Sequence, residues 1–124
     1  MCGSVIAIDH VQLAMPEGGE TEARRFYSDL LGIPEVPKPE NLAARRGGWF
    51  ERPSLKIHLG VEKHFVPARK AHPAFIVDDL FAMVSRLQAA GAHVVEDEPL
   101  AGFVRRYVCD PFGNRIELMQ PVDW

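Results

Sequence analysis

The pattern of hydrophobic and polar residues divides the chain into two halves with the same predicted order of elements. In the first half, apolar and polar residues alternate over residues 6–14, which is typical of a half-buried strand. A helical spacing of apolar residues follows, with Thr21 as the expected N-cap and Gly32 as the stop. The predicted elements are a strand at 6–14, a helix at 21–31, and strands at 42–46, 48–51 and 55–61.

The second half repeats this order after a polar, basic linker at residues 62–70. Its helix is expected over residues 79–90, with Asp78 or Asp79 as the N-cap. The expected buried stripe of this helix is Leu80, Val84 and Leu87. The predicted strands are 72–77, 94–95, 104–109 and 114–119, and the last two are joined by a turn at 110–114. Because a repeat of about 60 residues is marginal alone, we expect the halves to share a core or a cleft.

The repeat places residues that can bind a metal at matching positions. His10 and His72 stand 62 positions apart, and His58 and Glu117 stand 59 apart. A longer first connection, at residues 15–20, accounts for the difference. Side chains alternate between the two faces of a strand, and all four residues fall on the face opposite the apolar residues of their strands. We therefore expect the four side chains to converge on one cavity.

Three imidazoles and a carboxylate suit one divalent ion of the Zn, Ni, Fe, Co or Mn kind. The alternative is that each residue is an ordinary half-exposed strand position. A single strand histidine is usually just that, so the paired placement of the four residues carries the metal hypothesis.

Composition narrows the class of partner. The chain of 124 residues is 47% hydrophobic and 25% charged with a net charge of −3, which favours a globular domain and gives no reason to expect nucleic acid. No apolar run is long enough for a membrane helix or a signal peptide, so we expect a cytoplasmic protein without a membrane partner. Cys2 and Cys109 are expected to be free thiols.

Three stretches carry a resemblance to a known group of proteins. They are Ile8-Asp9-His10-Val11, the helix segment from Phe26 to Gly32, and the run from Asp110 to Leu118 (DPFGNRIEL), which is the most specific. On these motifs the chain resembles the vicinal oxygen chelate superfamily. This group includes glyoxalase I, methylmalonyl-CoA epimerase, extradiol dioxygenases, fosfomycin-resistance transferases and bleomycin-binding proteins.

The resemblance implies an α+β fold made of two βαβββ modules. Their sheets would form a curved, incompletely closed mixed β-barrel with the helices outside. The whole chain, residues 1–124, would be one such domain, with modules at residues 5–62 and 71–121. In metal-dependent members the ligands come from the first and last strand of each module, which here hold His10, His58, His72 and Glu117.

Several functions remain open on this fold. The first is a metal-dependent isomerase, lyase or epimerase that chelates neighbouring oxygens of a small substrate and stabilises an enediolate-like intermediate. Glu117 would then be the base and His58 a possible second base. The second is an extradiol-type dioxygenase with an iron triad of His10, His72 and Glu117. The third is a non-catalytic protein that binds an antibiotic, as in bleomycin resistance.

Two further expectations concern the substrate and the assembly. Arg105 and Arg106 are adjacent on a strand, so only one of them can face the cavity, where it would bind a carboxylate or phosphate of the substrate. In the resembling proteins the cleft lies within one chain or between two chains, and we expect a homodimer.

Overall fold

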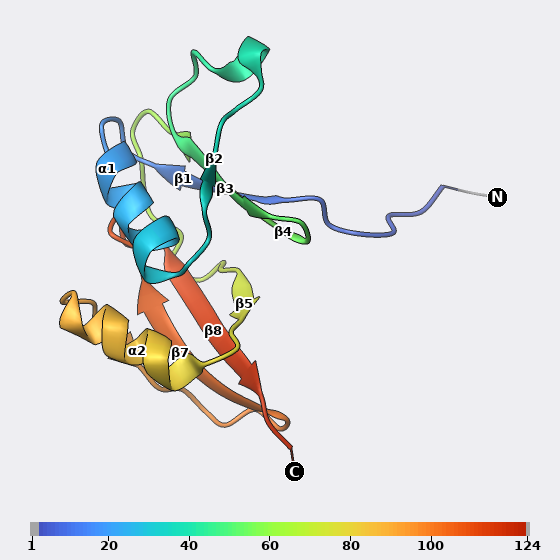
Figure 1. Ribbon diagram of the computed structural model, residues 1–124, viewed down its shortest axis with the longest axis vertical. Coiled ribbons are helices and arrows are strands. Elements are labelled where there is room, and N and C mark those ends of the chain that lie inside the picture. The colour runs from blue at the N-terminus through green and yellow to red at the C-terminus, as the bar shows by residue number, and fades with distance from the viewer. Residues whose placement is uncertain (1–2, 124) are drawn as a thin grey trace.

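The computed structural model describes residues 3–123 and contains two four-stranded sheets (Figure 1). The strand order is β1-β4-β3-β2 in the first sheet and β5-β8-β7-β6 in the second. In each sheet the first strand of the module runs parallel to the last, and the remaining pairs are antiparallel. The strands are β1 (Val11–Met15), β2 (Glu35–Val36), β3 (Gly48–Arg52), β4 (Leu55–Val61), β5 (Ala74–Ile76), β6 (Val94–Val95), β7 (Phe103–Cys109) and β8 (Arg115–Pro121).

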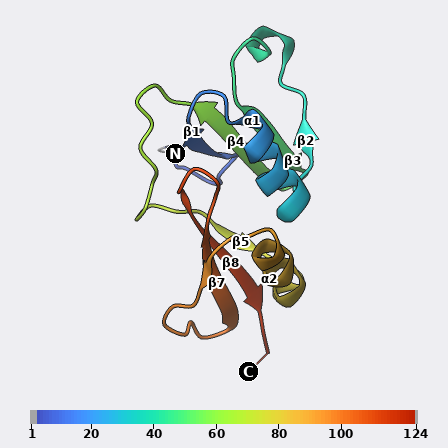
Figure 2. The ribbon, with the colours of Figure 1, turned by 90° about the vertical axis from the view of Figure 1, so that its left-hand side faces the viewer.

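The helices lie on one side of the two sheets (Figure 2). Helix α1 (Glu20–Ala23) continues directly into the π-helix η1 (Arg24–Leu30), and α2 (Leu80–Ala89) occupies the equivalent place in the second module. A short 3₁₀ helix, η2 (Glu40–Leu42), precedes β3. Two βαβββ modules with open sheets confirm the predicted α+β class. Among residues 3–123, no strand of one sheet pairs with a strand of the other.

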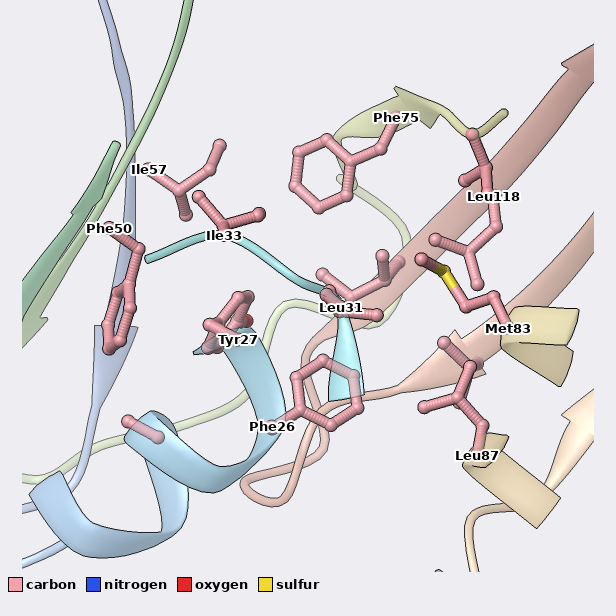
Figure 3. Close-up of a cluster of buried hydrophobic side chains, with 14 of the residues drawn as sticks. Phe26, Tyr27, Leu31, Ile33, Phe50, Ile57, Phe75, Met83, Leu87 and Leu118 are labelled. Carbon is pink, nitrogen blue, oxygen red and sulfur yellow. The ribbon is translucent and has the colours of Figure 1, made fainter. Parts of the chain in front are cut away.

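Both modules contribute to one hydrophobic core (Figure 3). Tyr27, Phe50 and Ile57 come from the first module, and Phe75 and Leu118 come from the second. The close-up shows Phe26 and Leu31 of the first module between the two groups. Continuous packing of this kind holds two small sheets together that would each be marginal alone.

Buried polar contacts at the turn before β8 also join the modules. The hydroxyl of Tyr27 donates to Asp110 Oδ2 at 2.7 Å. Asn114 Nδ2 donates to the carbonyl of Ala14 at 2.8 Å, and its Oδ1 accepts from the N–H of Ala68 at 3.0 Å. The predicted turn at 110–114 therefore forms the hairpin and also fixes the first module against the second.

The structure corrects two expectations in the first module. The prediction of a strand at 42–46 is wrong, because η2 and a turn occupy this region. The sheet is instead completed by β2. Prolines surround β2, and a sheet tolerates them there because β2 lies at its edge and pairs only with β3. Thr21 is not the helix cap, since the helix begins at Glu20 after Gly19.

In the second module Asp79 is confirmed as the cap and accepts a hydrogen bond from the N–H of Ala82 at 3.0 Å. The buried stripe of α2 includes Met83, whereas Val84 is only partly buried. Cys109 is a free, exposed thiol, and Cys2 lies outside the described residues. No helix within residues 3–123 has the length and apolar character needed to cross a membrane.

Candidate metal centre

Two of the predicted ligands meet on the first sheet. His10 lies just before β1, and its ring stacks on the ring of His58 in β4 with 4.4 Å between the centroids. The indole of Trp49 covers His58 as well, at 3.9 Å and with the rings almost parallel. His58 is thus 5% exposed, and β3 and β4 bring it to the face away from Ile57 and Leu59, as the alternation predicted.

Glu51 is the polar partner of His58, although no motif in the sequence singled it out. Its Oε2 lies 2.7 Å from His58 Nε2. Because an ionised carboxylate only accepts hydrogen bonds, a neutral His58 facing one carries its proton on Nε2 and keeps its lone pair on Nδ1. The available signal was strand parity, because Trp49 and Glu51 lie on the same face of β3 and pair with His58 and Lys56.

The other two predicted ligands meet on the second sheet. His72 precedes β5, and its Nε2 lies 3.0 Å from Glu117 Oε1. His72 Nδ1 lies 2.9 Å from the carbonyl oxygen of Lys70, which can only accept a hydrogen bond. A neutral His72 therefore donates through Nδ1 and presents the Nε2 lone pair to a carboxylate.

This arrangement fits a bound cation. Metal-binding histidines usually donate their other ring N–H to a carbonyl or carboxylate, as His72 does to Lys70. With metal–ligand distances of about 2.1 Å, neighbouring ligands at a right angle are separated by roughly 3 Å. His72 Nε2 and Glu117 Oε1 have this separation at 3.0 Å. Either a proton or a metal ion removes the repulsion between the lone pair and the carboxylate.

Two donors surround Glu117, which is 6% exposed, together with His72, which donates to it only when Nε2 carries a proton. Besides His72, the hydroxyl of Tyr107 lies 3.1 Å from Oε1 and Arg105 Nη1 lies 3.2 Å from Oε2. Burial on its own would raise the pKa of Glu117, but the hydrogen bonds from His72, Arg105 and Tyr107 outweigh it and lower the pKa below its usual value. Burial and the hydrogen bond to Glu117 raise the pKa of Tyr107.

The two adjacent arginines point to opposite faces of β7. Arg105 faces Glu117, and this contact raises the pKa of its guanidinium. Arg106 pairs with Glu96 at 3.1 Å on the other face. Of the two candidate substrate residues, the structure thus places Arg105 beside the predicted ligands.

The four predicted ligands form two separate pairs. Within residues 3–123, no group of three or more histidine, cysteine, aspartate or glutamate side chains is arranged to hold a metal ion. His10 and His72 do line one groove of about 800 Å³ between β1 and β5, but His58 and Glu117 do not. One chain therefore presents two half-sites, one on each sheet.

The sequence matches the family described as a glyoxalase-like domain over residues 13–119. The chain belongs to this family. The match covers both half-sites except His10, and it places the chain in the vicinal oxygen chelate superfamily. No protein with a curated description matches the chain.

Solved structures with this fold differ in their described functions. A glyoxalase family protein from Bacillus anthracis is 46% identical, with a TM-score of 0.91 over 98% of this chain and 100% of that one. A glyoxalase/dioxygenase from Nostoc punctiforme is 21% identical, with a TM-score of 0.77 over 99% and 100%. An antibiotic-binding protein from Streptomyces is 23% identical, with a TM-score of 0.69 over 95% and 100%. The last two likenesses establish the fold alone.

Proposed function

We propose that this glyoxalase-like protein is a divalent-metal-dependent enzyme of the isomerase, lyase or epimerase type that acts on a small substrate with neighbouring oxygens. The observation that carries the proposal is the His72–Glu117 pair, in which a ring nitrogen and a carboxylate oxygen converge at 3.0 Å while the other ring nitrogen donates to a carbonyl. His10 and His58 are the remaining proposed ligands. When bound, the ion supplies Lewis-acid stabilisation of negative charge on the substrate oxygens.

The geometry separates the roles of the two candidate bases. Glu117 accepts hydrogen bonds from Arg105 and Tyr107 and has a lowered pKa, so it is suited to holding a cation and poorly suited to taking a proton. His58 is held by Glu51 through Nε2 and retains Nδ1 as its basic atom. We therefore propose Glu117 as a ligand positioned by Arg105 and Tyr107, and His58 as the stronger candidate for the base in any state in which its Nδ1 is not bound to the ion.

We propose that two copies of the chain complete the site as a homodimer. β1 and β5 are both edge strands, with one hydrogen-bonded neighbour each. Residues 3–8 run past the start of β4 into solvent (Figure 1), where Val5 and Ile6 are each 94% exposed and Ile8 is 80% exposed. Three large apolar side chains on an extended arm beside an open edge favour a second copy as the occupant. Its second sheet would supply His72 and Glu117 to His10 and His58.

Metal analysis tests the site directly. The untagged protein is expected to contain about one transition metal ion per proposed site by plasma mass spectrometry. The variants His72→Ala and Glu117→Gln should lose it, whereas His64→Asn, which removes an exposed imidazole from the linker, should keep it. A wild-type protein that takes up no metal from any of the five candidate ions would refute the proposal and favour a binding protein.

Mixed dimers test the assembly. A heterodimer of one His10→Ala chain and one Glu117→Gln chain has one intact site of two if the ligands come from different chains. Co-expression of the two variants should restore metal that neither holds alone. If metal binds the wild type but never the mixture, the site lies within one chain and the dimer proposal is wrong. Ile6→Asp, on the arm, should shift sedimentation from dimer to monomer.

The second candidate function is an extradiol-type dioxygenase, favoured by the hydrogen bond that ties His58 to Glu51. With His58 held there, His10, His72 and Glu117 form a two-histidine, one-carboxylate set that leaves three positions open on an iron ion. Metal retained in His58→Ala, with iron preferred, supports this function. Metal lost in His58→Ala supports the four-ligand enzyme.

A further inference from the structure

A pocket of about 510 Å³ lies on the second sheet. Arg69 and Arg115 line it, together with Tyr107 and His93. Tyr107 links the pocket to the proposed metal site, because its hydroxyl contacts Glu117 Oε1 at 3.1 Å while the guanidinium of Arg115 lies 4.0 Å above its ring. A group bound at Arg115 would thus be one aromatic ring away from Glu117.

Backbone contacts build this pair of arginines into the fold. The N–H of Arg115 donates to the carbonyl of Ala68 at 2.9 Å, and the N–H of Ala68 donates to Asn114 Oδ1 at 3.0 Å. These two bonds fasten the linker to the start of β8. Gly113 allows the approach, because a Cβ there would meet Pro67 at 3.2 Å. Arg69 therefore stands beside Arg115, although 46 positions separate them in the sequence.

The guanidinium groups of Arg69 and Arg115 have N–H donors available for a ligand, in contrast to that of Arg105. Arg105 is engaged through all three of its guanidinium nitrogens, with its Nε and Nη2 on the carbonyl of Glu98 and its Nη1 on Tyr107 and Glu117. Within residues 3–123, the guanidinium groups of Arg69 and Arg115 form no hydrogen bond to protein. The nearest carboxylate to Arg115, that of Asp97, is 3.8 Å away and half-exposed, which makes a weak ion pair that a bound anion can replace.

We infer that this pocket is an oxyanion subsite in which Arg115 and Arg69 bind a carboxylate or phosphoryl group. A planar guanidinium fixed over an aromatic ring presents two parallel N–H donors, which match the paired oxygens of such groups. The substrate of the proposed metal site is then an anion whose charged group is separate from its chelating oxygens. This assignment of the substrate rests on the proposed function, whereas the subsite itself does not.

Anion binding to the metal-free protein tests the subsite. Backbone amide spectra are recorded during titration with inorganic phosphate and with acetate, at constant ionic strength set with chloride. The amides around Tyr107, Gly113 and Arg115 should shift to saturation with at least one of the two anions. Binding should weaken by roughly tenfold or more in Arg115→Gln and in Arg69→Gln. Arg25→Gln, which removes an exposed guanidinium from the helix side, should bind as the wild type does.

The results separate the alternatives. Saturation with phosphate alone assigns a phosphoryl group, and saturation with acetate alone assigns a carboxylate. The subsite is overturned if no saturable shifts are seen, or if the wild type and Arg69→Gln bind the anion equally well. Because Arg69 is exposed on the linker, Arg69→Gln is expected to fold. The metal content of Arg115→Gln separates a failure of the anion subsite from a failure of the proposed metal site. Anion binding without any metal uptake would support the subsite and remove only the proposed function.

Discussion

Removal of the Tyr27 hydroxyl is expected to destabilise the protein measurably, because this hydroxyl joins the two modules inside the core. The side chain is fully buried, and its hydroxyl lies 2.7 Å from Asp110 Oδ2. Burial, followed by the charge of Asp110, raises the pKa of Tyr27 well above its usual value, so the hydroxyl remains a donor throughout the neutral range. Tyr27→Phe keeps the ring in the core and removes only this donor.

The magnitude follows from the surroundings of Asp110. Its carboxylate also accepts from the backbone N–H groups of Phe112 and Asn114 and from Asn114 Nδ2. Three of four donors remain after the change, so the carboxylate stays largely compensated. A hydrogen bond to a charged group contributes about 1.5–3 kcal/mol. We therefore expect Tyr27→Phe to lower the free energy of unfolding by roughly 2 kcal/mol, with a fall of about 6–12 °C in the unfolding temperature.

Urea unfolding followed by tryptophan fluorescence measures this change. The midpoint should move while the slope m stays constant, as expected when only native-state stability is altered. Asp110→Ala should cost more than Tyr27→Phe, because it leaves Tyr27, Asn114 and two backbone N–H groups without their acceptor. A loss smaller than about 0.5 kcal/mol in Tyr27→Phe would show that this bond contributes nothing beyond ring packing and would refute the reasoning.

Two further predictions concern Glu117 and the glycines. The pKa of Glu117 is lowered in the folded protein, so the carboxylate contributes its full stabilisation above the ordinary pKa of 4.5 and loses it as the pH falls through the pKa of the folded state. When the free energy of unfolding is measured from pH 7 to pH 3, Glu117→Gln should therefore lose less stability on the acid side than the wild type does. An unchanged profile would contradict the lowered pKa. Gly47→Ala should destabilise by more than about 3 kcal/mol, because φ is +99° and the new Cβ would lie 2.0 Å from the carbonyl oxygen of Leu59. The matched variant is Gly91→Ala, where φ is +88° and the new Cβ would have no atom within 4 Å. It should lower the free energy of unfolding, measured by chemical denaturation, by only about 1–2 kcal/mol. Equal losses in the two variants would show that the contact with the Leu59 carbonyl is unimportant.

Periodicity predicted the order of the elements and the faces of the site residues, whereas the two-module fold was expected from the family resemblance. Alternation placed His58 and Glu117 on the correct faces of β4 and β8, and the helix of the second module was found with its cap at Asp79. The edge strand β2 was missed because two residues among prolines carry no period, and its pairing with β3 is decided by tertiary contact.

The partners of the site residues were harder to predict than the residues themselves. Glu51 and Tyr107 belong to no motif, and only strand register brings them to His58 and Glu117. Convergence of all four predicted ligands on one cavity was expected, with one or two chains left open as its source, and the two sheets of a chain keep the pairs apart. Parity fixes the face of a sheet on which a side chain lies and contains no information on how two sheets are placed.

The Asn114 contacts have a consequence for the order of folding. Its bond to Ala14 joins positions 100 residues apart, whereas the hairpins β3–β4 and β7–β8 pair neighbours in the chain. Closing such a long loop is entropically costly, so this contact forms after the local hairpins have been made. Loss of the Asn114 amide should then mainly accelerate unfolding and leave the refolding rate nearly unchanged. The lifetime of the native state then depends in part on a contact that the chain makes after its local hairpins.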